Sequence, residues 1–431
     1  MERYDSYKDS GVKWLGEIPS HWEVVKLKSL CKMFGRIGFR GYSRDDLVDD
    51  GEGAITLSPS NFSDGHLDFS NSSYLSWSKY YESPEIMVQN GDIVFVKTAS
   101  IGKVAYVENL PVETTVNPQI LVFKEIKCNA KFLSYYLQST KIQGWIVASA
   151  NGSTISTISQ VSVGNYPVIL PAQKVQEALV EYIDIEISKI DAAIARQQKM
   201  IDLLNERKQI IINNAVTKGL DSNVSMKDSG IEWVGQVPKH WKLNRLKTFL
   251  SIKDKRNFDA MATLLSVYTA IGVKPRAELE EKGNKASTVL NYKIVNKGDL
   301  IVNRLLAWMG AYGISNYDGV TSPDYDVYSF KEGYHKDFYG IMFRNTNFKS
   351  DCYKFGHGIM MMRWRTYPDE FLNILVPIPP YEEQKQIYDY LLPQIDKINE
   401  GIDKCNQIVS LLQERKQIII NDVVTGKVKV V

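Results

Sequence analysis

Apolar residues between positions 173 and 213 recur at heptad spacing, which predicts a long helix with one narrow apolar stripe. Successive members of the stripe lie 4, 3, 4, 7, 3 and 7 residues apart: Ile183, Ile187, Ile190, Ile194, Ile201, Leu204 and Ile211. Gln197 and Lys208 stand at the two skipped positions. The stripe can pack on its own globular domain or on another helix, and its narrowness favours another helix.

A segment near the end of the chain repeats this stripe with Leu391, Ile395, Ile398, Ile402, Val409, Leu412 and Ile419, and with Cys405 and Lys416 in the gaps. Prolines at 171 and 379–380 precede the two patterns, where a helix tolerates proline. Pro393 lies inside the second pattern and should kink the helix or mark a late start. We expect the seam of a coiled coil at Ile187, Ile190, Ile194, Ile201, Leu204, Ile395, Ile398, Ile402, Val409 and Leu412.

Two further matches show that the chain is a tandem duplication. KDSGVKWLGEIPSHW (8–22) recurs as KDSGIEWVGQVPKHW (227–241), with nine of fifteen positions identical. ERKQIIIN (206–213) recurs unchanged at 414–421. The middles, roughly 31–165 and 250–370, align poorly. They are either two drifted sheet domains or one frame that carries two different binding surfaces.

The middles have the pattern of mixed α/β domains. Short apolar runs such as 93–96, 121–123 and 300–302 predict strands. Helical spacing of apolar residues appears within 130–140 and 338–343. A length of 431 residues fits two or three such domains.

Composition excludes several classes of protein. The chain has no run of 18 apolar residues and no apolar N-terminal stretch, so we expect no membrane span and no secretory signal. Four scattered cysteines, Cys31, Cys128, Cys352 and Cys405, are typical of reduced thiols in a cytoplasmic protein and do not suggest a zinc site. A net charge of +2 means that any nucleic-acid surface must be a local patch.

No catalytic constellation is found. The Gly-Lys pair in 100–104 lacks the remainder of a phosphate-binding loop. There is no Asn/Asp-Pro-Pro-aromatic tetrapeptide, and no glycine-rich cofactor loop follows a strand. His21 and His240 occupy matching repeat positions beside tryptophans, where we expect a structural role in a packed turn.

Side chains suited to nucleic-acid contact gather in loops of both middles, because arginine, lysine and short polar side chains bind base edges and phosphates. In the first middle the candidates are Arg36, Arg40, Lys97, Thr98, Ser100, Lys103, Asn151, Ser153 and Thr154. In the second middle they are Lys253, Lys255, Arg256, Asn303, Arg304, Trp308, Arg363 and Arg365.

Together these features resemble the specificity subunits of Type I restriction–modification systems over essentially the whole chain. The resemblance is carried by the duplicated opening motif, by GDIVFVKTASIGKV (91–104) and GDLIVNRLLAWMG (298–310), and by the domain ends YPVILP (166–171) and VPIPPYEEQ (376–384). The first domain end departs from the usual pattern, with AQKVQ at 172–176 in place of the second copy's YEEQ.

The resemblance implies an α+β fold. Two mixed α/β target-recognition domains in a pseudo-two-fold arrangement would be joined by two long helices that form an antiparallel coiled coil. We place the first target-recognition domain at 1–171 and its helix at 172–219, and the second domain at 220–379 and its helix at 380–431.

The resemblance also implies that each domain reads one half of an asymmetric bipartite DNA site. The helices would set the spacer and dock two methylation subunits, which methylate adenine N6. Two restriction subunits would add cleavage. We expect no cofactor or metal in this chain, because S-adenosylmethionine, ATP and Mg²⁺ would belong to those partners.

Two rival functions make different predictions. A chain with its own methyltransferase or nuclease activity would bind S-adenosylmethionine alone. An interaction scaffold built on the coiled coil would show no salt-dependent DNA affinity even with its partner subunits.

Overall fold

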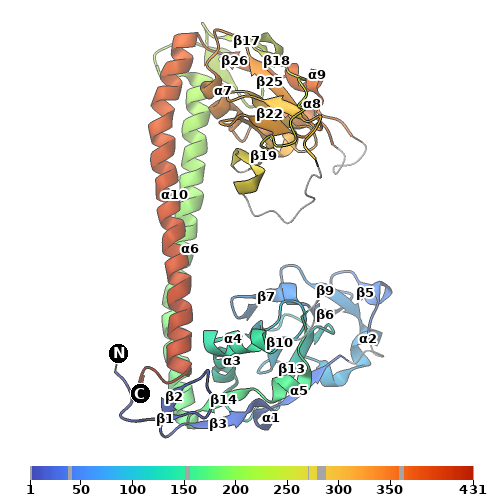
Figure 1. Cartoon of the computed structure of the whole chain (residues 1–431), viewed down its shortest axis with the longest axis vertical. Coiled ribbons are helices and arrows are strands. Elements are labelled where there is room, and N and C mark those ends of the chain that lie inside the picture. Colours follow the sequence, from blue (N-terminus) through green and yellow to red (C-terminus); the bar gives the residue numbers. More distant parts are fainter. Residues whose placement is uncertain are drawn as a thin grey trace. The chain divides into compact units, whose positions relative to one another are not determined.

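The computed structural model describes residues 2–36, 41–150, 156–269, 271–278, 288–358 and 364–430. It divides into two compact units. Unit 1 comprises Met1–Gln197 with Gln407–Val431, and unit 2 comprises Gln198–Asn406. Two long helices, α6 (Gln173–Lys218) and α10 (Tyr381–Val424), each contribute one half to each unit (Figure 1).

Unit 1 is built around a four-stranded antiparallel sheet with the order β11-β10-β13-β4. Its strands are β4 (Lys32–Gly35), β10 (Ile93–Val96), β11 (Val104–Tyr106) and β13 (Ile120–Lys124). A second sheet has the order β12-β6-β9-β5 and contains β5 (Leu47–Val48), β6 (Gly53–Leu57), β9 (Ser73–Ser76) and β12 (Thr114–Val116).

Smaller elements complete unit 1. Its hairpins and paired ends are β1 (Tyr7–Asp9) with β2 (Glu17–Pro19), β3 (Glu23–Lys26) with β14 (Pro167–Leu170), and β7 (Phe62–Ser63) with β8 (His66–Leu67). Its short helices are α1 (Leu27–Leu30), α2 (Trp77–Tyr81), α3 (Ala130–Gln138), α4 (Thr140–Ala148) and α5 (Gln160–Gly164).

Unit 2 repeats this plan with a sheet of order β23-β22-β25-β18. The strands are β18 (Leu250–Ile252), β22 (Leu300–Asn303), β23 (Tyr312–Ile314) and β25 (Tyr325–Phe330). Around it lie the pairs β15 (Met226–Asp228) with β16 (Gln236–Pro238), β17 (Lys242–Arg245) with β26 (Leu375–Ile378), β19 (Leu265–Tyr268) with β20 (Gly272–Pro275), and β21 (Lys293–Val295) with β24 (Gly319–Thr321). Its short helices are α7 (Lys336–Phe343), α8 (Phe348–Phe355) and α9 (Pro368–Leu372).

The two middles therefore share one fold despite their poor sequence match. The central sheets have the same strand order, and β10 pairs with β13 as β22 pairs with β25. In each unit the hydrophobic core contains residues of this sheet, of two short helices and of the apolar faces of α6 and α10. The short helices are α3 and α4 in unit 1 and α7 and α8 in unit 2. The sequence prediction of mixed α/β domains with long paired helices is confirmed.

In unit 1 the two helices pack along the predicted stripe. Ile187 and Ile190 are buried in the same cluster as Ile419 and Ile420. Lys416, at a skipped heptad position, is only 7% exposed, and its ammonium contacts the Asp191 carboxylate at 2.9 and 3.1 Å. A buried lysine at this position is tolerated because it has this partner.

In unit 2 the two helices run antiparallel, because residues later in α6 contact residues earlier in α10. Leu204 packs on Gly401, and Lys208 donates to Asn399 at 3.0 Å. Burial, and then the charge of Arg344, lower the pKa of Lys208. The expectation that Pro393 marks a late helix start is wrong, because α10 begins at Tyr381 and runs through this exposed proline.

The tryptophan that ends each copy of the repeated opening motif packs against the C-terminal end of a long helix. Gly219 follows α6 and Gly426 follows α10, both with positive φ (74° and 70°). A Cβ on Gly219 would meet the Trp241 ring at 3.2 Å, and one on Gly426 would meet the Trp22 ring at 3.0 Å. Only glycine allows both the left-handed turn and this close approach, which explains the pairing of HW with a helix-terminal glycine in each copy.

A glutamine at the start of each long helix makes the same contacts in both units. Gln176 donates to Pro171 O and accepts from Asn129 N, at 2.7 and 2.8 Å. Gln384 donates to Pro379 O and accepts from His335 N at the same distances. The unusual first domain end therefore keeps the residue that fixes the helix start.

Among the described residues, no helix has both the length and the hydropathy needed to cross a membrane.

Candidate nucleic-acid interface

The residue that follows the second strand of each central sheet occupies an equivalent position in the two units. Lys97 directly follows β10 and Arg304 directly follows β22, and both are the seventh residue of their copy of the repeated motif that begins with Gly-Asp. The carbonyl of Lys97 accepts from Ile158 N at 2.9 Å, and that of Arg304 accepts from Thr366 N at 3.0 Å. Both positions therefore lie beside the loop that precedes a short helix, α5 or α9. The structure brings together candidates that are far apart in sequence.

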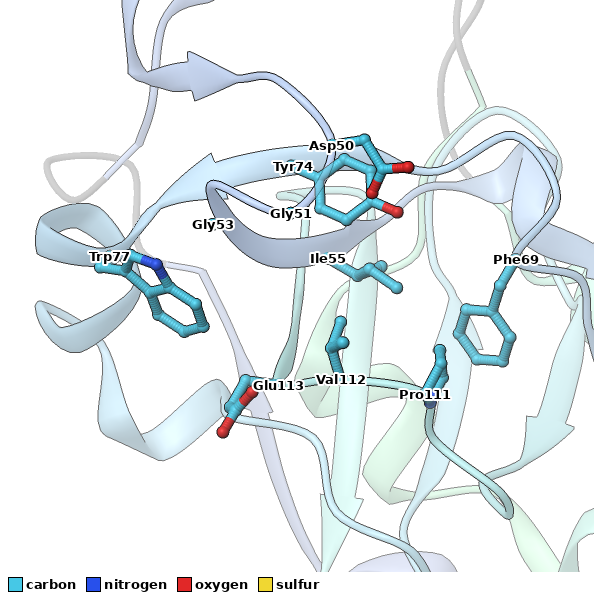
Figure 2. A pocket seen from close by; sticks show the side chains of 10 residues that line it. All are labelled: Asp50, Gly51, Gly53, Ile55, Phe69, Tyr74, Trp77, Pro111, Val112 and Glu113. Atoms are coloured by element: carbon cyan, nitrogen blue, oxygen red, sulfur yellow. The ribbon is translucent and has the colours of Figure 1, made fainter.

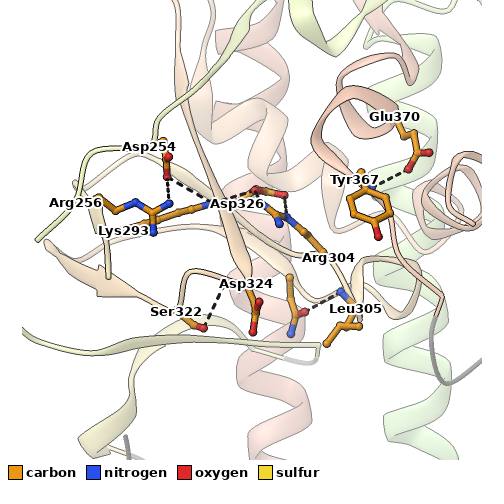
Figure 3. A network of polar contacts seen from close by, with 11 residues as sticks. Asp254, Arg256, Lys293, Arg304, Leu305, Ser322, Asp324, Asp326, Tyr367 and Glu370 are labelled. Carbon is orange, nitrogen blue, oxygen red and sulfur yellow. Dashed lines mark hydrogen bonds and ion pairs between the residues drawn. The ribbon is translucent and has the colours of Figure 1, made fainter. Parts of the chain in front are cut away.

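In unit 2 a buried carboxylate holds the candidate arginine in place (Figure 3). Asp326 is fully buried and accepts from Arg304 Nε at 2.7 Å and from a second guanidinium nitrogen. Lys293, 3% exposed, donates to the same carboxylate at 3.1 Å. The hydrogen bond to Asp326 is the main cause of the raised pKa of Arg304. The guanidinium is thus charged and oriented before any ligand arrives.

Aromatic side chains lie in the turn that follows this arginine and in the neighbouring loop. Trp308 donates from its indole to Leu305 O at 3.0 Å. Trp364 stacks on Tyr353 with ring centroids 4.8 Å apart, and Trp308 meets Tyr353 edge-on at 6.3 Å. Arg365 is exposed in the same loop and pairs through its backbone with His357. Arg304, Trp308 and Arg365 thus lie on neighbouring loops of unit 2 as one basic and aromatic surface, while Asn303 is buried at the end of β22.

In unit 1 the equivalent lysine has no carboxylate beside it among the interactions of the described residues. Burial lowers the pKa of Lys97. Thr98 lies next to it, with its hydroxyl 3.0 Å from that of Thr157, and Ser100 is exposed. Lys103 is exposed too, but its ammonium donates to Pro59 O at 3.1 Å.

Strand register shows why the two sites differ. Asp326 pairs opposite Val302 on β22 where Leu121 pairs opposite Phe95 on β10. Lys293 lies five residues before Gly298, as Ile86 lies five before Gly91. Unit 1 therefore has buried leucine and isoleucine where unit 2 has a buried ion pair. Sequence reasoning missed Asp326 and Lys293, although a carboxylate inside the apolar strand YDVYSF was a usable signal.

Two candidates are held by contacts within the protein, one of them buried and one partly exposed. Arg36 is only 4% exposed and donates to Val116 O and Thr115 Oγ1 at 3.1 and 3.2 Å. Lys253 forms an ion pair with Asp299 at 2.5 Å.

Other candidates lie near the surface. Arg256 forms an ion pair with Asp254 at 2.7 Å, and Lys255 is exposed beside it. Five candidates lie outside the described residues: Arg40, Asn151, Ser153, Thr154 and Arg363. A DNA role for every candidate in both units stays a prediction.

A cavity of about 240 Å³ lies elsewhere in unit 1, beside β6 and α2. Ile55 and Val112 lie between the rings of Trp77 and Phe69, with the carboxylates of Asp50 and Glu113 at its rim (Figure 2). Carboxylates repel phosphate groups, so this cavity does not suit a DNA backbone.

The described residues contain no group of three or more histidine, cysteine, aspartate or glutamate side chains that could hold a metal ion. His240 instead lies 2.6 Å from Glu383, which also accepts from the Trp241 indole at 2.8 Å.

Comparisons with known proteins point to one family. Residues 19–201 match the model of the Type I restriction modification DNA specificity domain. The chain is 24% identical to the putative type I restriction enzyme MjaX specificity subunit of Methanocaldococcus jannaschii and 22% identical to the MjaVIII specificity subunit of the same organism. The alignments cover 98% of this chain in both cases, and 98% and 97% of those relatives.

A solved structure from work on complex assembly and conformational transition of the type I R-M system has the same fold. Its TM-score is 0.66 at 14% identity, over 95% of this chain and 99% of that one.

Proposed function

Because the chain belongs to the specificity-subunit family of Type I restriction–modification systems, we propose that its two units read the two halves of a split DNA site. The chain has a role in specific DNA recognition. Our proposal adds that Lys97 and Arg304, with the loops beside them, are the centres of the two reading surfaces.

One observation carries this proposal: equivalent positions on the same fold hold different chemistry. An arginine fixed by a buried carboxylate suits the acceptor edge of a guanine, whereas a half-buried lysine beside threonine and serine does not repeat that geometry. Two unlike surfaces on one frame require unlike half-sites. The site should therefore be asymmetric and bipartite, with an unread spacer.

Single-molecule methylome mapping in cells that express this chain with its methylation subunits tests the proposal. We expect methylated adenines in one asymmetric motif with a gap. A palindromic motif, or methylation that does not depend on this chain, would contradict it.

The helices α6 and α10 should set the length of the spacer, because both run between residues of unit 1 and residues of unit 2. Lengthening both by about four residues, roughly one turn, should change the spacer and leave the half-sites unchanged. Methylome mapping that finds an unchanged spacer length would contradict this part of the proposal.

The same helices carry two matching exposed stripes that suit two methylation subunits. On α6 the stripe consists of Met200, Leu203 and Ile210, which are 49%, 50% and 52% exposed. On α10 the equivalent residues Ile408, Leu411 and Ile418 are 42%, 65% and 50% exposed. Apolar side chains that recur at matching exposed positions of both helices, outside the buried stripe, indicate two equivalent protein contacts.

Native mass spectrometry can count the bound subunits. Leu203→Glu or Leu411→Glu alone should each remove one methylation subunit, and the double variant should remove both. A complex that keeps two subunits in the double variant would contradict this docking surface. Asn205→Glu, which adds a negative charge at an exposed α6 position on the face away from the stripe, is the matched control.

We also propose that this chain performs no chemistry itself, and that the complex acts in the cytoplasm. Adenine N6 methylation, with S-adenosylmethionine, would belong to the methylation subunits, and ATP-dependent cleavage to two restriction subunits. The isolated chain should then bind no S-adenosylmethionine in calorimetry, whereas the complex with methylation subunits should.

A further inference from the structure

The turn that follows Arg304 presents two leucines to solvent at the centre of the second reading surface. Leu305 is 36% and Leu306 39% exposed. Figure 3 shows the Leu305 side chain near that of Arg304. Exposed leucines beside a charged reading residue need an explanation, because the neighbouring Ala307 on the same turn is fully buried.

The backbone of this turn is held from both sides. Leu305 N donates to the side chain of Asn303 at 3.0 Å, and Leu305 O accepts from the Trp308 indole at 3.0 Å. Leu306 N donates to Asn303 O at 3.1 Å. Asn303 is itself 5% exposed, so the turn is anchored in the domain. Little backbone freedom would be lost when the leucines meet a ligand.

Unit 1 has different side chains at the same two positions. Alignment of the 91–104 and 298–310 motifs sets Leu305 against Thr98 and Leu306 against Ala99. The apolar pair thus belongs to unit 2 alone and lies where the two reading surfaces differ most. A role in the shared frame would be expected to appear in both copies.

From this arrangement, and resting on the proposed function, we infer that Leu305 and Leu306 select thymine in the second half-site by covering its 5-methyl group. The major groove offers one apolar feature on a base edge, the thymine methyl, and apolar side chains are its complement. Arg304 would bind a hydrogen-bond acceptor or phosphate while the adjacent leucines contact the methyl group.

Replacement of thymine by deoxyuridine tests this inference directly, because it removes only the methyl group. Thymines of each half-site are replaced one at a time in the mapped duplex, and binding by the complex with its methylation subunits is measured. At least one thymine of the second half-site should lose about four-fold in affinity, as expected for one methyl group left in water. The Leu305→Ala, Leu306→Ala double variant should lose this difference between the two duplexes.

Two controls separate the outcomes. Leu375→Ala, an exposed leucine on β26 of the same unit, should keep the full deoxyuridine effect. Deoxyuridine in the first half-site should act equally on the wild type and the double variant. Equal melting temperatures of all variants would exclude a folding defect.

Three results would overturn the inference. The affinity of the wild-type complex could be unchanged by deoxyuridine at every position of the second half-site. The double variant could still lose affinity on the same replacement, or it could lose its methylation subunits instead. Failure of the proposed function would look different. The complex would then lack salt-dependent, site-specific affinity even for unmodified DNA.

Discussion

Unit 1 and unit 2 have the same sheet, but two matched interior positions near Lys97 and Arg304 hold different side chains. At these positions unit 1 has buried Leu121 and Ile86, whereas unit 2 has the buried ion pair of Asp326 and Lys293. A buried ion pair rarely adds stability over well-packed apolar residues, so stability alone does not account for it. The buried Asp326 carboxylate orients the Arg304 guanidinium, which we propose reads the second half-site.

A second difference lies at the repeated tryptophans. The Trp241 indole donates to Glu383, whereas the buried Trp22 indole has no hydrogen-bond partner among the described residues. The position equivalent to Glu383 in the first copy is Val175, which lines a small pocket with His21. The frame is therefore shared in shape, with one polar contact missing from unit 1.

The largest effect is expected from Asp326→Ala. This change leaves Lys293 charged and buried, and should lower the free energy of unfolding of unit 2 by about 3–5 kcal/mol. Segment-resolved hydrogen exchange should show faster exchange in unit 2 only. A combined Lys293→Ile, Asp326→Leu variant, which copies unit 1, should regain most of the stability and still read the second half-site poorly. Normal reading by that variant would contradict an orienting role for Asp326.

Next in size are the two reading residues themselves. Arg304→Ala should weaken site-specific binding by about 1–3 kcal/mol and relax methylation at the second half-site only. Lys97→Ala should act on the first half-site only. Methylome profiles compared between the two variants check this division, and identical profiles would contradict it.

The tryptophan contact predicts a smaller, reciprocal pair of changes. Glu383→Val should destabilise unit 2 by about 1–3 kcal/mol, because it leaves a buried indole donor unpaired. Val175→Glu should stabilise unit 1 by supplying the missing acceptor, by about 1 kcal/mol. Thermal unfolding followed by hydrogen exchange measures both. A Val175→Gln variant, with an uncharged acceptor, separates hydrogen bonding from charge.

The smallest effect concerns the helix pairs, Lys416 with Asp191 and Lys208 with Asn399. Asn399→Asp turns the second contact into an ion pair like the first and should add up to about 1 kcal/mol at low salt. Asp191→Asn should make the reverse change in unit 1. Denaturant unfolding at two salt concentrations tests the exchange, and an effect independent of salt would contradict a charge mechanism.

Much of the fold could be predicted from the sequence because its signals are local or repeated. The heptad stripes predicted both long helices, and the copied motifs predicted the duplicated frame. The close approach of Gly219 and Gly426 to Trp241 and Trp22 appears only in the structure. The shared sheet was harder to see, because strand pairing depends on contacts distant in sequence. Arg304 was a candidate by residue type, but its carboxylate partner is 22 residues away on the neighbouring strand.

The candidate site was predicted less completely for the same reason. A list of basic residues does not distinguish Arg36 from Arg304. Arg36 is buried and donates hydrogen bonds to residues of β12, whereas Arg304 is partly exposed and is oriented by the buried Asp326 carboxylate. Burial and hydrogen-bond partners separate them, and both require the three-dimensional structure. The two leucines after Arg304 were not candidates, because the sequence alone does not show that these apolar side chains are exposed.

The division of each long helix between the units has a consequence for biosynthesis. Unit 2 is one continuous stretch, Gln198–Asn406, so all of its residues have been translated before the last turns of α10. Unit 1 needs residues from 407 onward, whose isoleucines and valines complete its core. Domains usually fold in the order of their synthesis. Here the second unit can finish first, because the N-terminal domain stays incomplete until the residues of α10 from 407 onward have been made.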